Sequence, residues 1–263
     1  MEILSRSYYA KKIDSWLGSG LIIVLIGQRR VGKSYVMKDF IARHEKEADA
    51  NIVYIDKEKR SFRFISNCDD LDAHIDALLL PDKHNYILID EVQDIQGFEH
   101  TLRSLQAQDS CDIFITGSNA TMLSSELSTY LAGRYIEFHI HSLTYQEYLT
   151  FHRVEASTQS LRNYLTFGGL PYLSNLPQQQ EIVFEYLGNV FSTILLKDIV
   201  KREGIRNVDF LESLVLYTAD NVGNLFSANN ISRYLKSQRV NISPLQVINY
   251  LRSLQQAYLI HKV

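Results

Sequence analysis

The chain of 263 residues is short of cysteine and proline, and each shortage argues against a kind of protein. Its two cysteines, Cys68 and Cys111, lie far apart, and neither belongs to a Cys-x-x-Cys pair. This argues against a disulfide framework and against a cysteine-ligated structural zinc. Four prolines and twelve glycines are too few for long disordered linkers, and 46% hydrophobic with 22% charged residues is typical of a folded globular chain.

Long apolar runs and a strong charge of either sign are lacking as well. The longest apolar run, residues 21–26, is far shorter than the roughly 20 residues that cross a bilayer. Residues 1–6 lack the basic start and the apolar stretch of a secretion signal. A net charge of −3 points to neither nucleic acid nor a membrane. We therefore expect a cytoplasmic protein without a membrane partner.

What is present is a regular alternation of strands and helices in the first half of the chain. Short segments rich in Ile, Val and Leu predict five strands, at 21–26, 51–55, 86–89, 113–116 and 135–140. The first four are apolar on both faces, as in a parallel sheet covered by helices. Helices are expected at 8–17, 33–46, 69–80, 97–107 and 120–131. This alternation predicts a three-layer α/β core over residues 1–143.

The second half of the chain is predicted to be mainly helical. Helices are expected at 144–152, 158–167, 180–200, 208–219, 229–236 and 244–257. The last two resemble a helix-turn-helix, with Ser243 as the N-cap and Pro244 in the favoured first helical position. Residues 258–263 predict the strand that opens the hairpin of a winged helix. We therefore expect a fragment of a longer protein, truncated at its wing.

A phosphate-binding motif joins the first strand to the following helix. The pattern G-x-x-x-x-G-K-[ST] is filled by Gly27, Gln28, Arg29, Arg30, Val31, Gly32, Lys33 and Ser34. A chance match in a shuffled chain of this composition is on the order of one in a few hundred. Its glycines let backbone N–H groups and the helix N-terminus face phosphate oxygens. We expect Lys33 to reach the β- and γ-phosphates, Ser34 to ligate Mg²⁺, and Tyr35 to belong to the same site. The alternative is a strand-to-helix turn without a ligand.

Two acidic residues end another buried strand. Asp90 and Glu91 follow residues 86–89, at the carboxyl end of the strand, where ligands bind in open α/β sheets. Asp90 is expected to hold Mg²⁺, and Glu91 to act as general base on the attacking water. The alternative is a solvated acidic loop, because Asp94 and Glu99 follow closely.

A third polar element follows the strand at 113–116. Either Ser118 or Asn119 could contact the γ-phosphate or the attacking water. The same residues are also ordinary N-caps of a helix. The residues alone leave both interpretations open.

Together these three elements resemble the AAA+ superfamily, and more narrowly a prokaryotic branch near the archaeal-type ATPases. The phrases GQRRVGKS, ILIDEVQDI and FITGSNA are widespread in P-loop ATPases, whereas LAGRY, SLTYQEYL and FGGLPYL are more specific to this branch. The resemblance implies ATP or ADP with Mg²⁺, and five parallel strands in which strand 113–116 separates the P-loop strand from the acidic strand. It also implies a helical lid at 144–203, a winged helix at 204–263, and a nuclease-like domain beyond residue 263.

The resemblance also assigns roles to single residues. Asn119, with Ser118 beside it, matches the position that senses the γ-phosphate. Arg134 matches an arginine that reaches the nucleotide of a neighbouring subunit. A homo-oligomer is therefore a candidate assembly. The alternative role for Arg134 is a structural ion pair. Pro171, in Gly169-Leu170-Pro171, matches a GxP motif near the nucleotide base, although a tight turn also uses glycine and proline. The lid arginine of other AAA+ proteins is missing, which leaves open how lid movement is coupled to ATP hydrolysis. A switch that hydrolyses ATP slowly is therefore as credible as a motor that hydrolyses it rapidly.

The helix-turn-helix is the feature that links the chain to DNA. Its second helix is expected to expose Gln246, Asn249, Arg252 and Ser253, and it has apolar positions at Leu245, Val247, Ile248, Leu251 and Leu254. One arginine is weak evidence for DNA binding, because affinity for DNA comes mainly from neutralising several phosphates. Contact with a protein is equally open.

The leading hypothesis is an AAA+ ATPase that hydrolyses ATP with Mg²⁺ to move its lid and winged helix, with DNA as a candidate partner. The alternative is a nucleotide-gated switch or binding module with little turnover. A P-loop phosphotransferase is disfavoured because no acceptor site is evident. Two weaker signals remain. In residues 57–64 bases alternate with aromatics as on some single-strand nucleic-acid surfaces, although such a run is more often a solvated loop after a strand. His139 and His141 share one face of a strand and could pair on a metal, although such a pair without a third ligand is usually structural.

Overall fold

The computed structural model describes residues 3–108, 111–117, 131, 133–201, 208–238, 240 and 242–261. The chain divides into two compact units, Met1–Glu185 and Tyr186–Val263. The expected division into core, lid and winged helix at residues 143 and 203 stays a prediction.

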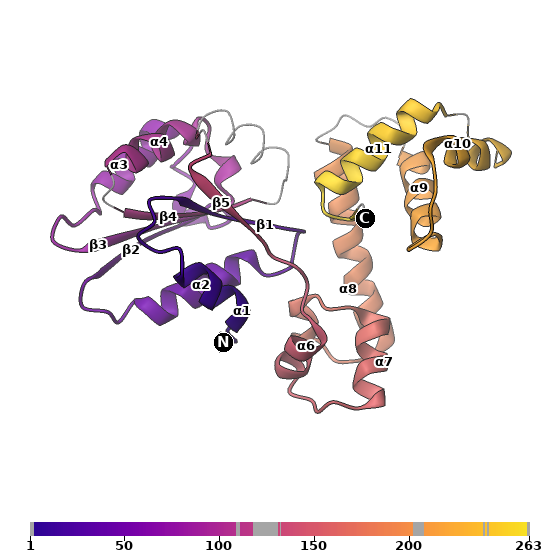
Figure 1. Cartoon of the computed structure of the whole chain (residues 1–263), viewed down its shortest axis with the longest axis horizontal. Coiled ribbons are helices and arrows are strands. Elements are labelled where there is room, and N and C mark those ends of the chain that lie inside the picture. Colours follow the sequence, from indigo (N-terminus) through magenta and orange to yellow (C-terminus); the bar gives the residue numbers. More distant parts are fainter. Residues whose placement is uncertain are drawn as a thin grey trace. The chain divides into compact units, whose positions relative to one another are not determined.

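A five-stranded parallel sheet forms the centre of the first unit, in the order β2-β3-β4-β1-β5 (Figure 1). Its strands are β1 (Ile22–Ile26), β2 (Ala50–Asp56), β3 (His84–Asp90), β4 (Cys111–Gly117) and β5 (Tyr135–His139). All five predicted strands are confirmed, with ends that differ by one or two residues. Since β4 lies between β1 and β3, the residues that follow these three strands meet at one edge of the sheet.

Helices cover both faces of this sheet, so the first unit has three layers (Figure 1). On one face lie α1 (Ser7–Asp14) and α2 (Lys33–His44), and on the other α3 (Cys68–Asp76) and α4 (Phe98–Gln108). The turns after β2 and β3 contain the short 3₁₀ helices η1 (Arg60–Phe62) and η2 (Val92–Asp94). The helix expected at 120–131 falls outside the described residues, apart from residue 131.

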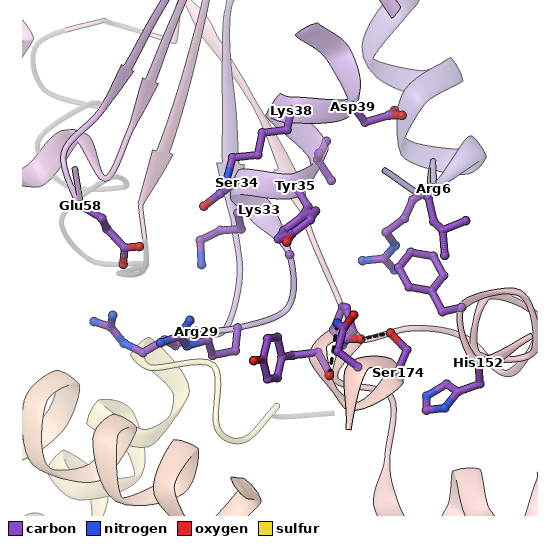
Figure 2. A pocket seen from close by; sticks show the side chains of 18 of the residues that line it. Arg6, Arg29, Lys33, Ser34, Tyr35, Lys38, Asp39, Glu58, His152 and Ser174 are labelled. Carbon is purple, nitrogen blue, oxygen red and sulfur yellow. Dashed lines mark hydrogen bonds between the residues drawn. The ribbon is translucent and has the colours of Figure 1, made fainter. Parts of the chain in front are cut away.

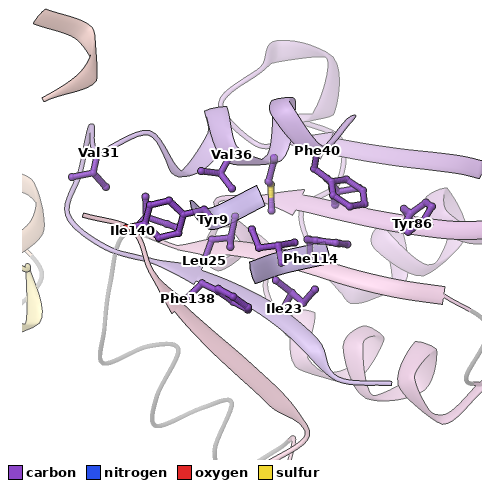
Figure 3. Close-up of a cluster of buried hydrophobic side chains, with 13 residues drawn as sticks. Tyr9, Ile23, Leu25, Val31, Val36, Phe40, Tyr86, Phe114, Phe138 and Ile140 are labelled. Carbon is purple, nitrogen blue, oxygen red and sulfur yellow. The ribbon is translucent and has the colours of Figure 1, made fainter. Parts of the chain in front are cut away.

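A buried cluster joins α1 and α2 to the sheet (Figure 3). Phe40 of α2 lies at its centre, with ring centroids 5.2 Å from Tyr86 of β3 and 4.5 Å from Phe114 of β4. Full burial of one such side chain contributes about 1.5–3 kcal/mol. This packing fixes α2, and with it the turn from which α2 starts.

Helical segments follow β5 within the first unit. Both α6 (Tyr145–His152) and α7 (Thr158–Phe167) begin with a capping box, in which the N-cap side chain accepts a hydrogen bond from the third helical N–H. Next come the 3₁₀ turn η3 (Pro171–Asn175) and α8 (Gln180–Thr193), and the boundary between the two units falls within α8. The caps explain why these helices begin where the sequence predicts.

The second unit contains the predicted helix-turn-helix. After the π-helical segment η4 (Ile194–Lys201) come α9 (Val208–Asp220), α10 (Ala228–Ser237) and α11 (Pro244–Gln256). Ser243 is the N-cap of α11 and forms a capping box with Gln246, and Pro244 is the first helical residue. The Ser232 hydroxyl of α10 donates to the Ile242 carbonyl at 2.6 Å, which ties α10 to the turn before α11.

Two predictions about this unit were wrong. Residues 258–261 form a turn and irregular chain where a strand was expected. On α11, Ser253 was expected to be exposed but is buried, and it donates its hydroxyl to the Asn249 carbonyl at 3.2 Å; Leu245 and Ile248 are 67% and 45% exposed. The buried stripe of α11 is therefore narrower than the apolar pattern predicts.

Candidate functional site

The P-loop turn is held against the end of β5. The Ile140 N–H donates to the Ile26 carbonyl at 2.7 Å. A Cβ on Gly27 would lie 2.2 Å from the Ile140 carbonyl oxygen, and the Gly27 φ of 144° is one that L side chains rarely adopt. Only glycine fits here, so the turn begins with its main chain packed on β5. It ends at Gly32, the N-cap of α2.

Lys33, the first residue of α2, lies inside this turn. Its side chain is buried, and its ammonium group donates to the carbonyl oxygens of Gly27 at 2.9 Å and of Gln28 at 3.1 Å. Burying an ammonium group is costly unless its donors are paired. The two bonds hold a positive charge at the N-terminus of α2, where the helix dipole already favours an anion.

Asp90, the last residue of β3, reaches the start of α2. It is 2% exposed, and it lies near enough to Ser34 for that hydroxyl to lower its pKa. Thr116 of β4 donates to Oδ1, and Tyr54 of β2 donates to Oδ2 at 3.3 Å. Burial raises the pKa of Asp90 above its ordinary value, and the bonds from Thr116 and Ser34 offset only part of that rise. Among the described residues no Lys or Arg forms an ion pair with this carboxylate.

Glu91 follows in a strained conformation. Its φ of 57° and ψ of 55° place a non-glycine residue in the left-handed region, which costs roughly 1–2 kcal/mol. Its N–H donates to Thr116 Oγ1 at 2.9 Å, and the Gln93 side-chain amide donates to its carboxylate. Thr116 thus bonds both acids. Such strain persists only where surrounding contacts hold it, which is common at functional sites.

Three of these contacting residues were not predicted as site residues: Tyr54, and Gln93 and Thr116, which lie within the phrases ILIDEVQDI and FITGSNA. Tyr54 and Thr116 lie near the carboxyl ends of the two strands that flank β3. A polar residue at the end of an otherwise apolar strand is the one signal that the sequence offered for them. The Gln93 contact depends on the turn at Glu91, which no pattern of residue types predicted.

A cavity of about 560 Å³ opens beside these residues (Figure 2). Figure 2 shows Lys33 and Ser34 directed towards Glu58 at one end, with His152 and Ser174 at the other. The predicted site residues that line it are Arg29, Arg30, Gly32, Lys33, Ser34, Tyr35, Glu91 and Pro171. Val31 packs in the buried cluster instead, and Gln28 contributes its carbonyl to Lys33. The volume falls within the roughly 300–1,000 Å³ of small-molecule sites.

Pro171 forms a wall of the cavity next to the P-loop. The Leu143 N–H donates to the Gly169 carbonyl at 2.7 Å, and a Cβ on Gly169 would lie 2.4 Å from the Leu143 carbonyl oxygen. Pro171 Cγ then lies 3.6 Å from where a Cβ on Gly32 would be. The geometry agrees with both interpretations of this motif, a tight turn and a part of the nucleotide site.

Arg6 is a buried residue that no motif predicted. Its guanidinium donates to the Glu147 carboxylate through Nε at 2.8 Å and through Nη2 at 2.9 Å. Its other N–H groups donate to the main-chain carbonyls of Val31, His141 and Ser142. Arg6 therefore ties the P-loop to the segment after β5 and to α6.

Arg134 lies at the opposite edge of the sheet from the P-loop. It directly precedes β5, whose first residue Tyr135 is paired with Ile22, the first residue of β1. The five residues of β1 at about 3.3 Å each separate that edge from Gly27 by about 16 Å. The Arg134 side chain is exposed and does not line the cavity of its own chain.

The remaining candidates give no site among the described residues. Ser118 and Asn119 lie outside them. His139 and His141 stack with ring centroids 6.4 Å apart, yet within the described ranges no three His, Cys, Asp or Glu side chains gather as metal ligands. In the same part of the chain, no helix combines the length and apolar character needed to cross a bilayer.

The order of the sheet and the turn between β1 and α2 define the first unit as a P-loop nucleotide-binding domain. Residues 19–149 match the family model described as "AAA domain". These residues therefore belong to the AAA+ superfamily of P-loop ATPases. Residues 158–263 match a domain of unknown function, DUF8612. The narrower resemblance to a branch with a GxP lid and a winged helix stays a prediction.

Two relatives match most of the chain. It is 32% identical, over 99% of its length, to an uncharacterized protein of Haemophilus influenzae, of which it covers 66%. It is 29% identical, over 91% of its length, to the uncharacterized protein MJ1544 of Methanocaldococcus jannaschii, of which it covers 55%. The chain thus spans somewhat less than two thirds, and just over half, of the length of these relatives.

Solved structures of similar fold include two proteins with a bound ligand. The Aeropyrum pernix ORC1 protein in complex with DNA is 12% identical with a TM-score of 0.45, over 97% of this chain and 85% of that one. AMPPCP-bound DnaA from Aquifex aeolicus is 15% identical with a TM-score of 0.42, over 97% and 89%. Similarities of this size say nothing about the ligands or partners of this chain.

Proposed function

We propose that this chain binds ATP with Mg²⁺ at the P-loop and hydrolyses it, and that the cycle moves a lid at 144–203 and a winged helix at 204–263. The observation that supports the proposal most is one cavity lined by Lys33 and Ser34 at the start of α2 and by Glu91 after β3. Asp90, buried at the end of β3, lies near enough to Ser34 for that hydroxyl to lower its pKa.

The groups at Ser34 and Asp90 fit Mg²⁺, which prefers oxygen ligands. A hydroxyl and a buried carboxylate lie near each other there, and no described Lys or Arg forms an ion pair with the carboxylate. When bound, Mg²⁺ neutralises charge on the β- and γ-phosphates. Ser34 and Asp90 would hold the ion, and Lys33 with the N–H groups of the turn would hold the phosphates.

Glu91 is the proposed general base. It accepts a proton from the water that attacks the γ-phosphate, and the bond from the γ-phosphorus to its bridging oxygen breaks to give ADP and phosphate. Thr116 and Gln93 fix Glu91 while it does so. Lys33 stabilises the negative charge on the transferred group. We assign the sensing of the γ-phosphate to Asn119 with Ser118.

For the winged helix we favour a protein partner over DNA. The described exposed face of α11 carries one cation, Arg252, and its exposed apolar residues are Leu245 and Ile248. DNA binding depends on neutralising several phosphates, which one arginine does not do. Large exposed apolar side chains are more typical of protein contacts.

Lys33→Ala is expected to weaken ATP binding by about 10- to 10²-fold. A hydrogen bond to a charged group contributes about 1.5–3 kcal/mol, and each 1.4 kcal/mol is tenfold in affinity. Isothermal titration of ATP, GTP and ADP with Mg²⁺ measures this loss, and a phosphate-release assay then measures turnover.

The matched control is Lys46→Ala, an exposed lysine just beyond α2, which should bind ATP like the wild type. Equal ATP affinity of the Lys33 and Lys46 variants would contradict the proposed site. Tight ATP binding with negligible phosphate release would instead favour the alternative of a switch with little turnover.

If Arg134 acts on the nucleotide of a neighbouring subunit, ATPase activity per chain should rise with protein concentration. An arginine that reaches the transition state contributes on the order of 10³–10⁵ in rate, so Arg134→Ala should remove the rise. Arg103→Ala, an exposed arginine of α4, is the control. A wild-type activity per chain that stays constant across concentrations at which the chain self-associates would count against this role.

A further inference from the structure

Two buried carboxylates lie side by side at the carboxyl edge of the sheet. Asp56 ends β2 and Asp90 ends β3, and the two residues are paired in register. They are 5% and 2% exposed. Like charges this close and this buried repel each other, so the groups between them decide how each carboxylate is oriented.

The Tyr54 hydroxyl lies between these carboxylates. Its oxygen is 3.3 Å from Asp90 Oδ2 and 3.4 Å from Asp56 Oδ2. A phenol has one hydrogen to donate, so Tyr54 can bond one carboxylate fully only by releasing the other. The pair of distances therefore describes a shared donor with two alternative partners.

Asp56 also holds the loop that follows it, residues 57–65, here called the coupling loop. The Glu58 N–H donates to Asp56 Oδ1 at 3.1 Å, and the Lys59 ammonium lies 3.6 Å from Asp56 Oδ2. The Lys57 N–H donates to the Asp90 carbonyl at 3.3 Å. Both strand ends thus bind the start of the coupling loop.

Lys57 connects the start of the coupling loop to its far end. Its ammonium group donates to the carbonyls of Phe62 and Ile65. Arg60 and Arg63 are exposed at the tip, and Phe64 is 58% exposed. The loop is therefore a small basic and aromatic surface that is anchored on the acids of the nucleotide site.

We propose that Tyr54 is a positioning residue that transmits the state of the nucleotide site to the coupling loop. The inference rests on the proposed function, in which Asp90 holds Mg²⁺. When Asp90 turns Oδ2 towards a cation, the Tyr54 proton is left to Asp56. Asp56 then holds Lys59 and the Glu58 N–H less tightly, and the loop loosens from its anchor.

The test compares amide hydrogen exchange of residues 57–65 with and without a non-hydrolysable ATP analogue and Mg²⁺. In the wild type, exchange of the loop is expected to speed up about 2–10-fold on binding, the factor that corresponds to about one net hydrogen bond. Tyr54→Phe should bind the analogue within a few-fold of the wild type, and its loop exchange should no longer respond. Tyr86→Phe, a core tyrosine of β3, is the control and should respond like the wild type.

Isothermal titration on the same samples separates the possible failures. A wild type that binds the analogue without a change in loop exchange overturns this inference and leaves the proposed function intact. If loop exchange in Tyr54→Phe changes on binding as much as in the wild type, this inference is also overturned and the proposed function is left intact. A wild type that does not bind overturns both. Asp56→Asn, which keeps the side-chain volume, should also abolish the response, and serves if Tyr54→Phe proves unfolded by circular dichroism.

Discussion

Replacing Glu91 with glutamine is expected to lower ATP turnover by about 10²–10⁴-fold and to leave ATP affinity within a few-fold. The amide keeps the size of the carboxylate but cannot accept the proton of the attacking water. Binding should survive because Lys33, Ser34 and the backbone of the turn hold the phosphates. Single-turnover phosphate release measures the loss, and isothermal titration with Mg²⁺ and ATP measures the affinity.

Asp94→Asn is the matched control for this variant. Asp94 belongs to the same acidic segment, but its side chain is exposed and does not line the cavity. Its turnover should equal that of the wild type. Unchanged turnover in Glu91→Gln would show that Glu91 is not the general base, and would favour the alternative interpretation of this segment as a solvated acidic loop.

Arg6→Ala is expected to lower the free energy of unfolding of the first unit by about 3–5 kcal/mol. Removing one partner of a buried ion pair leaves an uncompensated charge, here that of Glu147. It also leaves the carbonyls of Val31, His141 and Ser142 without the donors that Arg6 supplies. Urea denaturation followed by circular dichroism measures the change.

Arg43→Ala is the comparison for this loss of stability. Arg43 pairs with Asp14 and Asp39 but is 29% exposed, so its removal should cost about 0–1 kcal/mol. Arg6→Lys should restore only part of the stability, because an ammonium group lacks the planar fork that meets a carboxylate through two bonds. Equal losses in Arg6→Ala and Arg43→Ala would show that Arg6 is not the tie described above.

The Arg6 contact should also depend on pH. Burial raises the pKa of Glu147, but the bonds from Arg6 and Thr144 outweigh that effect and hold it below the ordinary 4.5. A lowered pKa in the fold means that the stabilisation is present above the unfolded pKa and is lost as pH falls through the folded pKa. The difference in unfolding free energy between wild type and Arg6→Ala should therefore shrink as the solution is acidified below pH 4.5.

The elements that the sequence predicted well are those whose signals are local. Strands β1 and β3 are apolar on both faces, which indicates burial between two layers of helices. The start of α11 was predictable because Ser243 and Pro244 act on the neighbouring backbone. The P-loop was predictable because a glycine such as Gly27 is needed by the local turn itself.

Residues that act across the fold were not predictable from one sequence. Tyr54 and Thr116 meet Asp90 because their strands flank β3 in the sheet; the family resemblance implied the place of β4, but spacing along the chain does not reveal which side chains meet there. Arg6 bonds Glu147 across 141 residues. On α11 the apolar pattern overestimated burial, because Leu245 and Ile248 face solvent in this unit. In each case the tertiary packing, and not a local preference, decides the contact.

The contact between Gly27 and Ile140 has a consequence for movement. The main chain that covers the P-loop continues within a few residues into α6, and Leu143 fixes Gly169 on the way. The chain segment that leads from β5 into α6 is thus packed on the turn that would bind the phosphates. If nucleotide binding shifts this turn, as the proposed function requires, Ile140 and Leu143 would pass the displacement on to the start of α6.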